Sequence, residues 1–153
     1  MDLGVFERGS GRRVKYHQGR LIDHVHLRVA DLARSKAFYR AVFEALGGLD
    51  AYGEGDGCFY LDELYVDQAE GQVSRVHLAF EARDRETVDR FHQAALGAGG
   101  RDNGAPGLRS YHAHYYAAFV LDPDGNNIES VWHGVTARSA ESVAIERIEP
   151  AES

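Results

Sequence analysis

Apolar and polar residues alternate in two short segments of the chain, and the second segment repeats the first 53 positions later. Apolar side chains occupy every second position of 25–29 and, in the later segment, of 76–80. A period of two is typical of a β-strand with one buried face. His24 and His77 take equivalent places in this alternation, on the faces opposite the apolar residues.

Each alternating segment leads into a helical pattern. Apolar residues recur three or four positions apart within 33–46 and within 85–97, which predicts a helix with one core-facing stripe in each range. Asp31 and Asp84 come just before these patterns, where a carboxylate can cap a helix N-terminus. Glycines follow both patterns and end them.

Three further strands are expected after each helix. In the first half they lie within 49–67. In the second half they lie near 101–103, 114–122 and 126–133, and "DPDGNN" predicts a hairpin turn between the last two. The repeat therefore predicts an α+β fold of two tandem β-α-β-β-β units.

The repeat also sets the expected domain boundaries. The two modules occupy about 21–67 and 74–133 of one domain, 21–133. Residues 1–20 form an N-terminal extension, and residues 134–153 form a C-terminal tail. The length of 153 residues is sufficient for a hydrophobic core without disulfides.

Composition narrows the partners and the compartment. A net charge of −7 without a basic stripe argues against nucleic acid as a partner. No apolar run approaches the roughly 20 residues of a membrane helix, and no secretory signal is recognisable, so we expect a cytoplasmic protein without a membrane partner. The single cysteine, Cys58, excludes an internal disulfide and is interpreted as a small buried thiol rather than a nucleophile.

Glu129 is the unusual residue of the last predicted strand. It interrupts the apolar run "IESVW", and its neighbours Ile128 and Ser130 belong to the opposite face. If those neighbours pack under a helix, Glu129 projects to the same side as His77. Two imidazoles and one carboxylate that leave open positions suit Fe(II), Mn(II), Ni(II) or Zn(II). The alternative is a solvated glutamate on an exposed face.

At these residues the chain resembles the vicinal oxygen chelate superfamily, which includes glyoxalase I, fosfomycin-resistance proteins, bleomycin-resistance proteins and extradiol dioxygenases. The motifs that carry the resemblance are "IDHVHLRVADLARSKAFYRAVF", "VHLAFEARDRETVDRFHQAALGAGG" and "FVLDPDGNNIES". The resemblance implies paired modules that form a curved, partly closed mixed β-sheet with the helices outside. It also implies a homodimer, and a divalent metal ion held by His24, His77 and Glu129.

Other residues are candidates for the same site. The resemblance implies a fourth metal ligand in the last strand of the first module, where Glu63 is the nearest acid to fit, although the adjacent Asp62 competes with it. His26 shares the face of His24 and is a candidate substrate contact or a hydrogen-bonded surface residue. The loop 104–116, rich in glycine, aromatics and histidine, adds three further candidate substrate contacts, Arg109, His112 and Tyr115.

Two readings of that loop and two classes of function stay open. The loop can cover a pocket, with His112 or His114 as a general acid–base, or it can simply pack on its own tyrosines. The chain can be a metal-dependent enzyme of lyase, isomerase or dioxygenase type that acts on a small oxygen-rich molecule. It can also be a metal-free protein of the bleomycin-resistance type that binds a small molecule.

Overall fold

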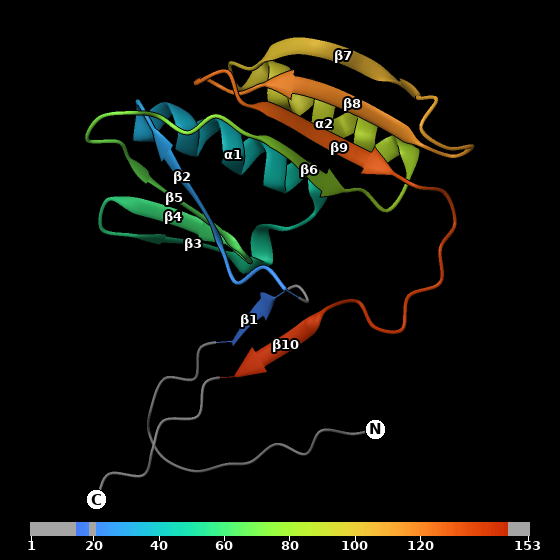
Figure 1. The fold of residues 1–153 in the computed structure, drawn as a ribbon, viewed down its shortest axis with the longest axis horizontal. Helices are drawn as coiled ribbons and strands as arrows, with labels where there is room; N and C mark the ends of the chain where they lie inside the picture. The colour runs from blue at the N-terminus through green and yellow to red at the C-terminus, as the bar shows by residue number, and fades with distance from the viewer. Residues whose placement is uncertain (1–14, 19–20, 147–153) are drawn as a thin grey trace, which may run out of the picture.

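The computed structural model describes residues 15–18 and 21–146, and its main body consists of two units with the same order of elements (Figure 1). The first unit runs β2 (Val25–Val29), α1 (Leu32–Leu46), a 3-10 turn (Leu49–Ala51), β3 (Tyr52–Gly55), β4 (Cys58–Leu61) and β5 (Leu64–Gln68). The second runs β6 (His77–Glu81), α2 (Arg85–Gly97), β7 (Arg101–Leu108), β8 (Tyr116–Leu121) and β9 (Asn127–Trp132). The predicted α+β fold of two β-α-β-β-β modules is therefore confirmed.

Both modules build their sheets by the same rule. The strand order is β2-β5-β4-β3 in the first sheet and β6-β9-β8-β7 in the second. In each sheet the first and last strands of the module pair in parallel, and the remaining pairs are antiparallel. As a consequence, the first strand of each module, β2 or β6, is an edge strand of its sheet.

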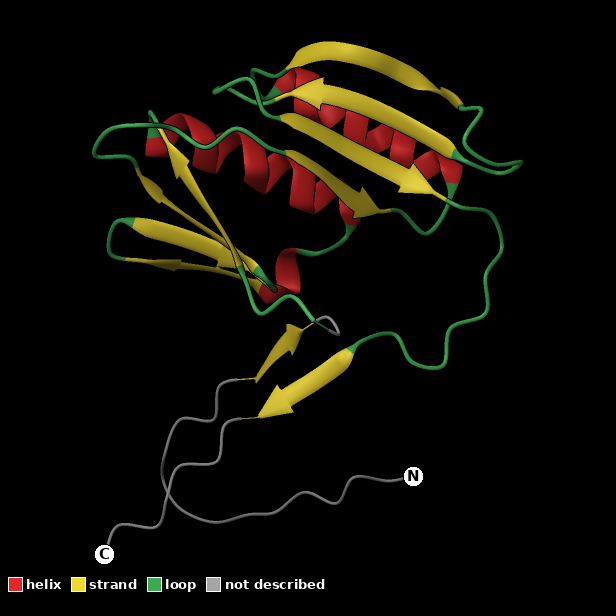
Figure 2. Cartoon of the chain, viewed as in Figure 1, coloured by secondary structure: helices red, strands yellow, loops and turns green. Residues whose placement is uncertain are grey.

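The two sheets differ from the expected arrangement in one respect. Within one chain they are two separate four-stranded sheets that do not close on one another (Figure 2), and α1 packs against both modules. The reason is that α1 is apolar toward both modules. The Tyr39 ring contacts Phe59 of the first sheet, and Phe43 packs edge-on against Phe80 of the second sheet.

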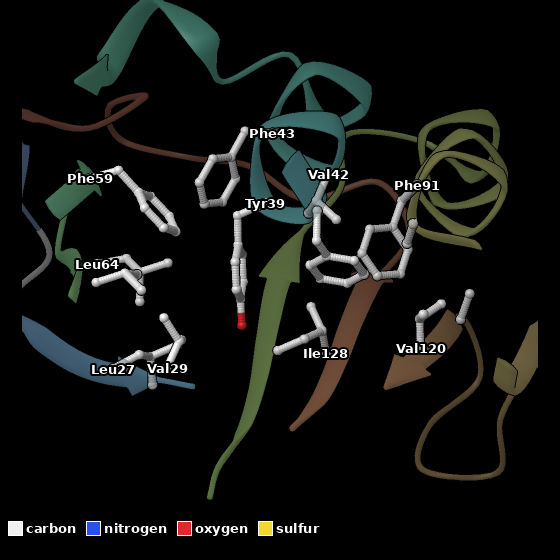
Figure 3. Packing of buried hydrophobic residues seen from close by; sticks show 14 of the residues in the cluster. Leu27, Val29, Tyr39, Val42, Phe43, Phe59, Leu64, Phe91, Val120 and Ile128 are labelled. Carbon is white, nitrogen blue, oxygen red and sulfur yellow. The ribbon is translucent and has the colours of Figure 1, made fainter. Parts of the chain in front are cut away.

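One core therefore serves both modules. Figure 3 shows side chains from α1, from α2 and from both sheets meeting there, among them Val42, Phe91 and Ile128. The Tyr39 hydroxyl crosses from α1 to donate to the carboxylate of Asp122, 2.7 Å away in the turn between β8 and β9. Burial and this neighbouring carboxylate raise the pKa of Tyr39 well above its usual value, so the hydroxyl stays protonated and keeps donating.

The helices begin at the predicted caps. Asp31 accepts from the backbone N–H of Arg34 at 3.0 Å, and Asp84 accepts from that of Thr87 at 2.7 Å. Each aspartate satisfies a donor that the first turn of the helix leaves without an intrahelical partner. Gly47 ends α1 in the left-handed conformation, φ 79°, which glycine adopts without a steric penalty.

The extension and the tail meet outside the modules. β1 (Lys15–Gln18) pairs antiparallel with β10 (Val143–Glu146) in a separate two-stranded sheet. The other residues of the extension, apart from this strand, lie outside the described part of the chain. Among the described helices none is both long and apolar enough to cross a bilayer.

Candidate functional site

The hairpin turn before β9 places Glu129. One oxygen of the Asp122 carboxylate accepts from the backbone N–H groups of Asp124 and Asn126, and the other accepts from the Asn126 side chain. The Asn126 side-chain oxygen in turn accepts from the Val76 backbone N–H at 2.9 Å. The turn therefore fastens the start of β9 to the start of β6, and this contact fixes the register of the parallel pair.

That register brings His77 and Glu129 together. Ala79 lies opposite Glu129, so His77 and Glu129 both project from the face of the second sheet that points away from α2, which we call the open face. On the opposite face, Ile128 packs into the core. This placement agrees with the strand alternation seen in the sequence.

Glu129 is buried, with 2% of its surface exposed, and both of its carboxylate oxygens have partners. His77 Nε2 lies 2.8 Å from one oxygen, and the Tyr115 hydroxyl donates to the other at 2.5 Å. The His77 side chain remains 52% exposed, so the buried carboxylate is joined to solvent through an accessible imidazole. A buried carboxylate with polar partners at an open surface is typical of a functional site rather than of a solvated strand residue.

Tyr115 stays protonated beside this carboxylate. Burial first, and then the hydrogen bond to Glu129, raise the pKa of Tyr115 from 10.0 to about 12. At neutral pH the hydroxyl therefore acts as a fixed donor. It occupies one oxygen of Glu129 and turns the other toward His77.

The loop between β7 and β8 supplies Tyr115 and also packs on itself. The Tyr111 and Tyr115 rings lie 4.8 Å apart, and Tyr115 packs edge-on against both His112 and His133. His112 Nε2 lies 2.8 Å from His133 Nδ1. The tyrosines therefore pack together, and one of them, Tyr115, reaches Glu129.

His133 was missed by sequence reasoning, although a signal for it exists. It follows Glu129 by four positions just beyond β9, and the period of two places it on the side of the strand that carries Glu129. The pairing of His133 with His112 depends on how the loop closes, and no strand or helix period reports loop closure.

Arg109 lies on the same open face. Its guanidinium stacks over the Phe119 ring, 5.4 Å from the ring centroid, and the His77 ring lies 6.0 Å from that same centroid. Phe119 is directly opposite Glu129 in the sheet. His77, Glu129, Tyr115 and Arg109, all from the second module, therefore surround one patch of the open face.

The first module places its candidates elsewhere. His24 comes just before β2, has a 64% exposed side chain and lies 2.7 Å from Asp23. His26 Nε2 lies 2.9 Å from Asp67, and its ring packs edge-on against Tyr65. Among the residues that the structure describes, no three His, Cys, Asp or Glu side chains gather closely enough to hold a metal ion.

Strand register shows which positions of the two modules correspond. Val25 pairs with Leu64 in the first sheet, and Leu78 pairs with Ile128 in the second. His24 is therefore the counterpart of His77, as the repeat indicates. By the same register Tyr65 is the counterpart of Glu129, whereas Glu63 comes just before β5 and its carbonyl accepts from the Val25 N–H at 2.6 Å.

Cys58 is a small buried thiol, as the sequence indicates. It is a free thiol with 8% of its surface exposed. It lies opposite Asp67 on β5, away from the patch around Glu129.

The comparisons with known proteins agree with this architecture. Residues 21–130 match the family model described as the glyoxalase/bleomycin resistance protein/dioxygenase superfamily. A crystal structure of a glyoxalase/bleomycin resistance protein from Albidiferax ferrireducens T118 is similar, with 29% identity and a TM-score of 0.62 over 73% of this chain and 98% of that one. A comparison with curated proteins finds no match.

Two further solved structures share the fold at lower identity. A glyoxalase-related enzyme from Fulvimarina pelagi has 17% identity and a TM-score of 0.62, over 82% of this chain and 97% of that one. A lactoylglutathione lyase from Agrobacterium tumefaciens has 20% identity and a TM-score of 0.54, over 74% of this chain and 93% of that one.

Proposed function

The chain belongs to the glyoxalase/bleomycin resistance protein/dioxygenase superfamily, and from that membership we propose that it is a divalent-metal-dependent enzyme acting on a small oxygen-rich molecule. The observation that carries the proposal is the buried carboxylate of Glu129 beside the exposed imidazole of His77. Burying an ionised carboxylate is costly unless it is paired or coordinates a cation.

The residues present fit such an ion. His77 Nε2 and the nearer Glu129 oxygen lie 2.8 Å apart, so a cation can take the place of the proton between them. Imidazole and carboxylate are ligands that Fe(II), Mn(II), Ni(II) and Zn(II) share. His24, the counterpart of His77, is the third proposed ligand, and Glu63 remains a candidate for a fourth.

Because His24 does not gather with His77 and Glu129 in one chain, we propose that a second copy supplies it in a homodimer. β2 and β6 are edge strands, and each has a side that no other described strand pairs with, although Arg28 of β2 forms hydrogen bonds with Ser74 on that side. A largely apolar cavity of about 550 Å³ lies beside the start of β2 and the middle of β6, and its lining includes Leu21, Ile22 and Phe80. Leu21 and Ile22 are 88% and 58% exposed, a large aliphatic surface for a single chain to leave in water.

The chain's own residues have defined parts in this chemistry. A bound divalent ion supplies a Lewis acid that polarises a substrate oxygen, as lyase, isomerase and dioxygenase reactions require. Tyr115 holds Glu129 in place through its hydroxyl, and His77 presents its imidazole to solvent. His112 packs against Tyr115 at the rim and is the proposed proton acceptor or donor for the substrate.

One observation favours the alternative of a metal-free binding protein. The hydrogen bonds from Tyr115 and His77 already engage both oxygens of Glu129 without a cation. In that case the patch around Phe119 binds a small molecule, and His77 is one of its polar contacts.

Metal titration separates the two functions. We expect the metal-free full chain to bind one equivalent per chain of Zn(II), Mn(II), Ni(II) or Fe(II), and Glu129→Ala and His77→Ala to bind far more weakly in calorimetry. His92→Ala is a matched control, because His92 also pairs with a carboxylate, Asp102, but on α2. Absence of metal binding by the wild type, or equal binding by all variants, would refute the metal-dependent enzyme and favour the metal-free binding protein.

Mixing two inactive variants tests whether the site is shared. His24→Ala and His77→Ala chains should each bind little metal alone. In a mixed dimer one of the two sites combines His24 of one copy with His77 of the other, so random exchange should restore about a quarter of the wild-type sites. Recovery of none would contradict a site completed by a second copy.

A further inference from the structure

The Arg109 guanidinium lies over the Phe119 ring, and two glycines beside it, Gly104 and Gly107, leave room for it. Gly104 and Gly107 of β7 lie opposite Phe119 and Ala117 of β8. A Cβ atom at Gly107 would come within 3.1 Å of Arg109 Nη1, and one at Gly104 within 2.9 Å of the Phe119 ring. Any larger residue at these positions would crowd the guanidinium or the ring on which it stacks.

Backbone carbonyls fix the orientation of the guanidinium. Arg109 Nη2 donates to the Ala105 carbonyl at 2.6 Å, and Nη1 lies 3.4 Å from the Leu108 carbonyl. A guanidinium has five N–H donors, so Nε–H and one N–H on each terminal nitrogen remain for another partner. These contacts hold the planar group in place before any ligand arrives.

Arg109 lies on the same face of the sheet as the carboxylate of Glu129 but forms no ion pair with it. Among the carboxylates that the structure describes, none forms an ion pair with Arg109. A preoriented cation without a protein anion, on a half-buried and partly apolar surface, is suited to an anionic ligand.

From this geometry we infer that Arg109 binds a carboxylate of the substrate, so that the substrate is a small organic acid whose reacting oxygens lie across the Phe119 ring, beside His77 and Glu129. The inference rests on the proposed function for the reacting end of the molecule. Both Arg109 and His77 contact Phe119, so a molecule of a few carbon atoms can span them.

A singly charged carboxylate fits this place better than a phosphoryl group. The planar guanidinium can match a planar carboxylate with two parallel hydrogen bonds. The carboxylate of Glu129 lies in the same row of the sheet as Phe119, and it would repel a dianion more strongly than a monoanion. The single positive charge of Arg109 also neutralises a monoanion fully but a dianion only by half.

The test uses three ligands that share a phenyl ring and differ in the head group: benzoate, benzamide and phenylphosphonate. Each is titrated into the full chain in EDTA, and binding is followed by the NMR shift of the Phe119 backbone amide. We expect benzoate to bind more tightly than benzamide and phenylphosphonate. Arg109→Ala and Arg109→Gln should weaken benzoate binding about tenfold or more, the usual effect of losing hydrogen bonds to a charged group.

Control variants keep the result specific. Arg101→Ala removes an exposed positive charge from the start of β7, the strand that ends just before Arg109, and should leave benzoate binding unchanged. Benzamide binding should be equal in the wild type and in both Arg109 variants. Equal binding of benzoate and benzamide by the wild type, retention of benzoate binding by the Arg109 variants, or tighter binding of phenylphosphonate would each overturn the assignment.

Since EDTA removes divalent ions, this result is independent of the metal titration. Arg109-dependent benzoate binding in a chain that binds no metal would retain the carboxylate subsite and refute the metal-dependent enzyme. Metal binding without Arg109-dependent benzoate binding would support the metal-dependent enzyme and refute the carboxylate subsite.

Discussion

The Tyr115–Glu129 contact links the loop to the strand that carries the candidate ligand. The hydroxyl belongs to a loop that packs on its own aromatic rings, while the carboxylate belongs to a buried strand. A single hydrogen bond of 2.5 Å therefore connects the loop between β7 and β8 to the buried strand β9. Short bonds to an ionised acceptor are stronger than bonds between neutral groups.

The raised pKa of Tyr115 has a consequence for stability at alkaline pH. In the unfolded chain the hydroxyl ionises near pH 10, whereas in the folded chain its pKa is about 12. The stability that this bond contributes is complete below pH 10 and is lost as the pH rises toward 12. We expect the wild type to lose free energy of unfolding more steeply across this window than Tyr115→Phe, measured by urea unfolding at a series of pH values.

Tyr111→Phe is the matched control for this slope. Tyr111 belongs to the same loop, but the residue is 71% exposed, and this variant should retain the steeper wild-type dependence. Identical slopes for Tyr115→Phe and the wild type would mean that the hydroxyl does not donate to Glu129 in solution.

At the scale of elements, the aspartate caps decide where the helices begin. Asp31→Ala removes the acceptor for the Arg34 backbone N–H, and we expect it to lower the free energy of unfolding by about 0.5–2 kcal/mol. Asp31→Ser should recover most of this loss, because a hydroxyl oxygen can accept the same hydrogen bond. Chemical denaturation at pH 7 measures the free energy of unfolding of both variants. Equal losses in Asp31→Ala and Asp31→Ser would show that the hydrogen bond from the Arg34 N–H does not account for the effect.

Sequence periodicity predicted these elements unequally well. The helices at 33–46 and 85–97 follow from apolar spacing, and α1 and α2 begin and end within one residue of those limits. β7 was expected only near 101–103 but continues to Leu108, because two register shifts at Gly104 and Gly107 let a glycine-rich edge strand stay paired with β8. Pro106 is tolerated there because the outer side of an edge strand needs no N–H donor.

The hydrophobic periodicity of the sequence could not predict how the two modules pack against each other. The apolar stripes of the helices show that they are buried but not which sheet they bury. Tyr39 and Phe43 contact both modules, so one helix helps to fill the core under both sheets. The positions of His77 and Glu129 could be inferred from alternation within one module. The position of His24 relative to them depends on how modules associate, including modules of different copies.

The exposed aliphatic residues before β2 allow a test at the same scale. Leu21→Ser with Ile22→Ser removes apolar surface that the proposed dimer buries, so we expect weaker self-association in sedimentation with little loss of monomer stability. Val135→Ser is the control, because Val135 is 98% exposed after β9 and should leave association unchanged. A wild type that sediments as a monomer at micromolar concentration would remove the dimer.

The parallel pairing of β6 with β9 also constrains the time at which the site forms. His77 and Glu129 are 52 residues apart in sequence, so their meeting requires closing a long loop. The helix α2 and the hairpin of β8 with β9 need only local contacts, and local contacts form sooner. In pulsed hydrogen exchange during refolding we expect amides of α2 to gain protection before those of β6. A chain interrupted late in folding would then have a nearly complete scaffold and no assembled site.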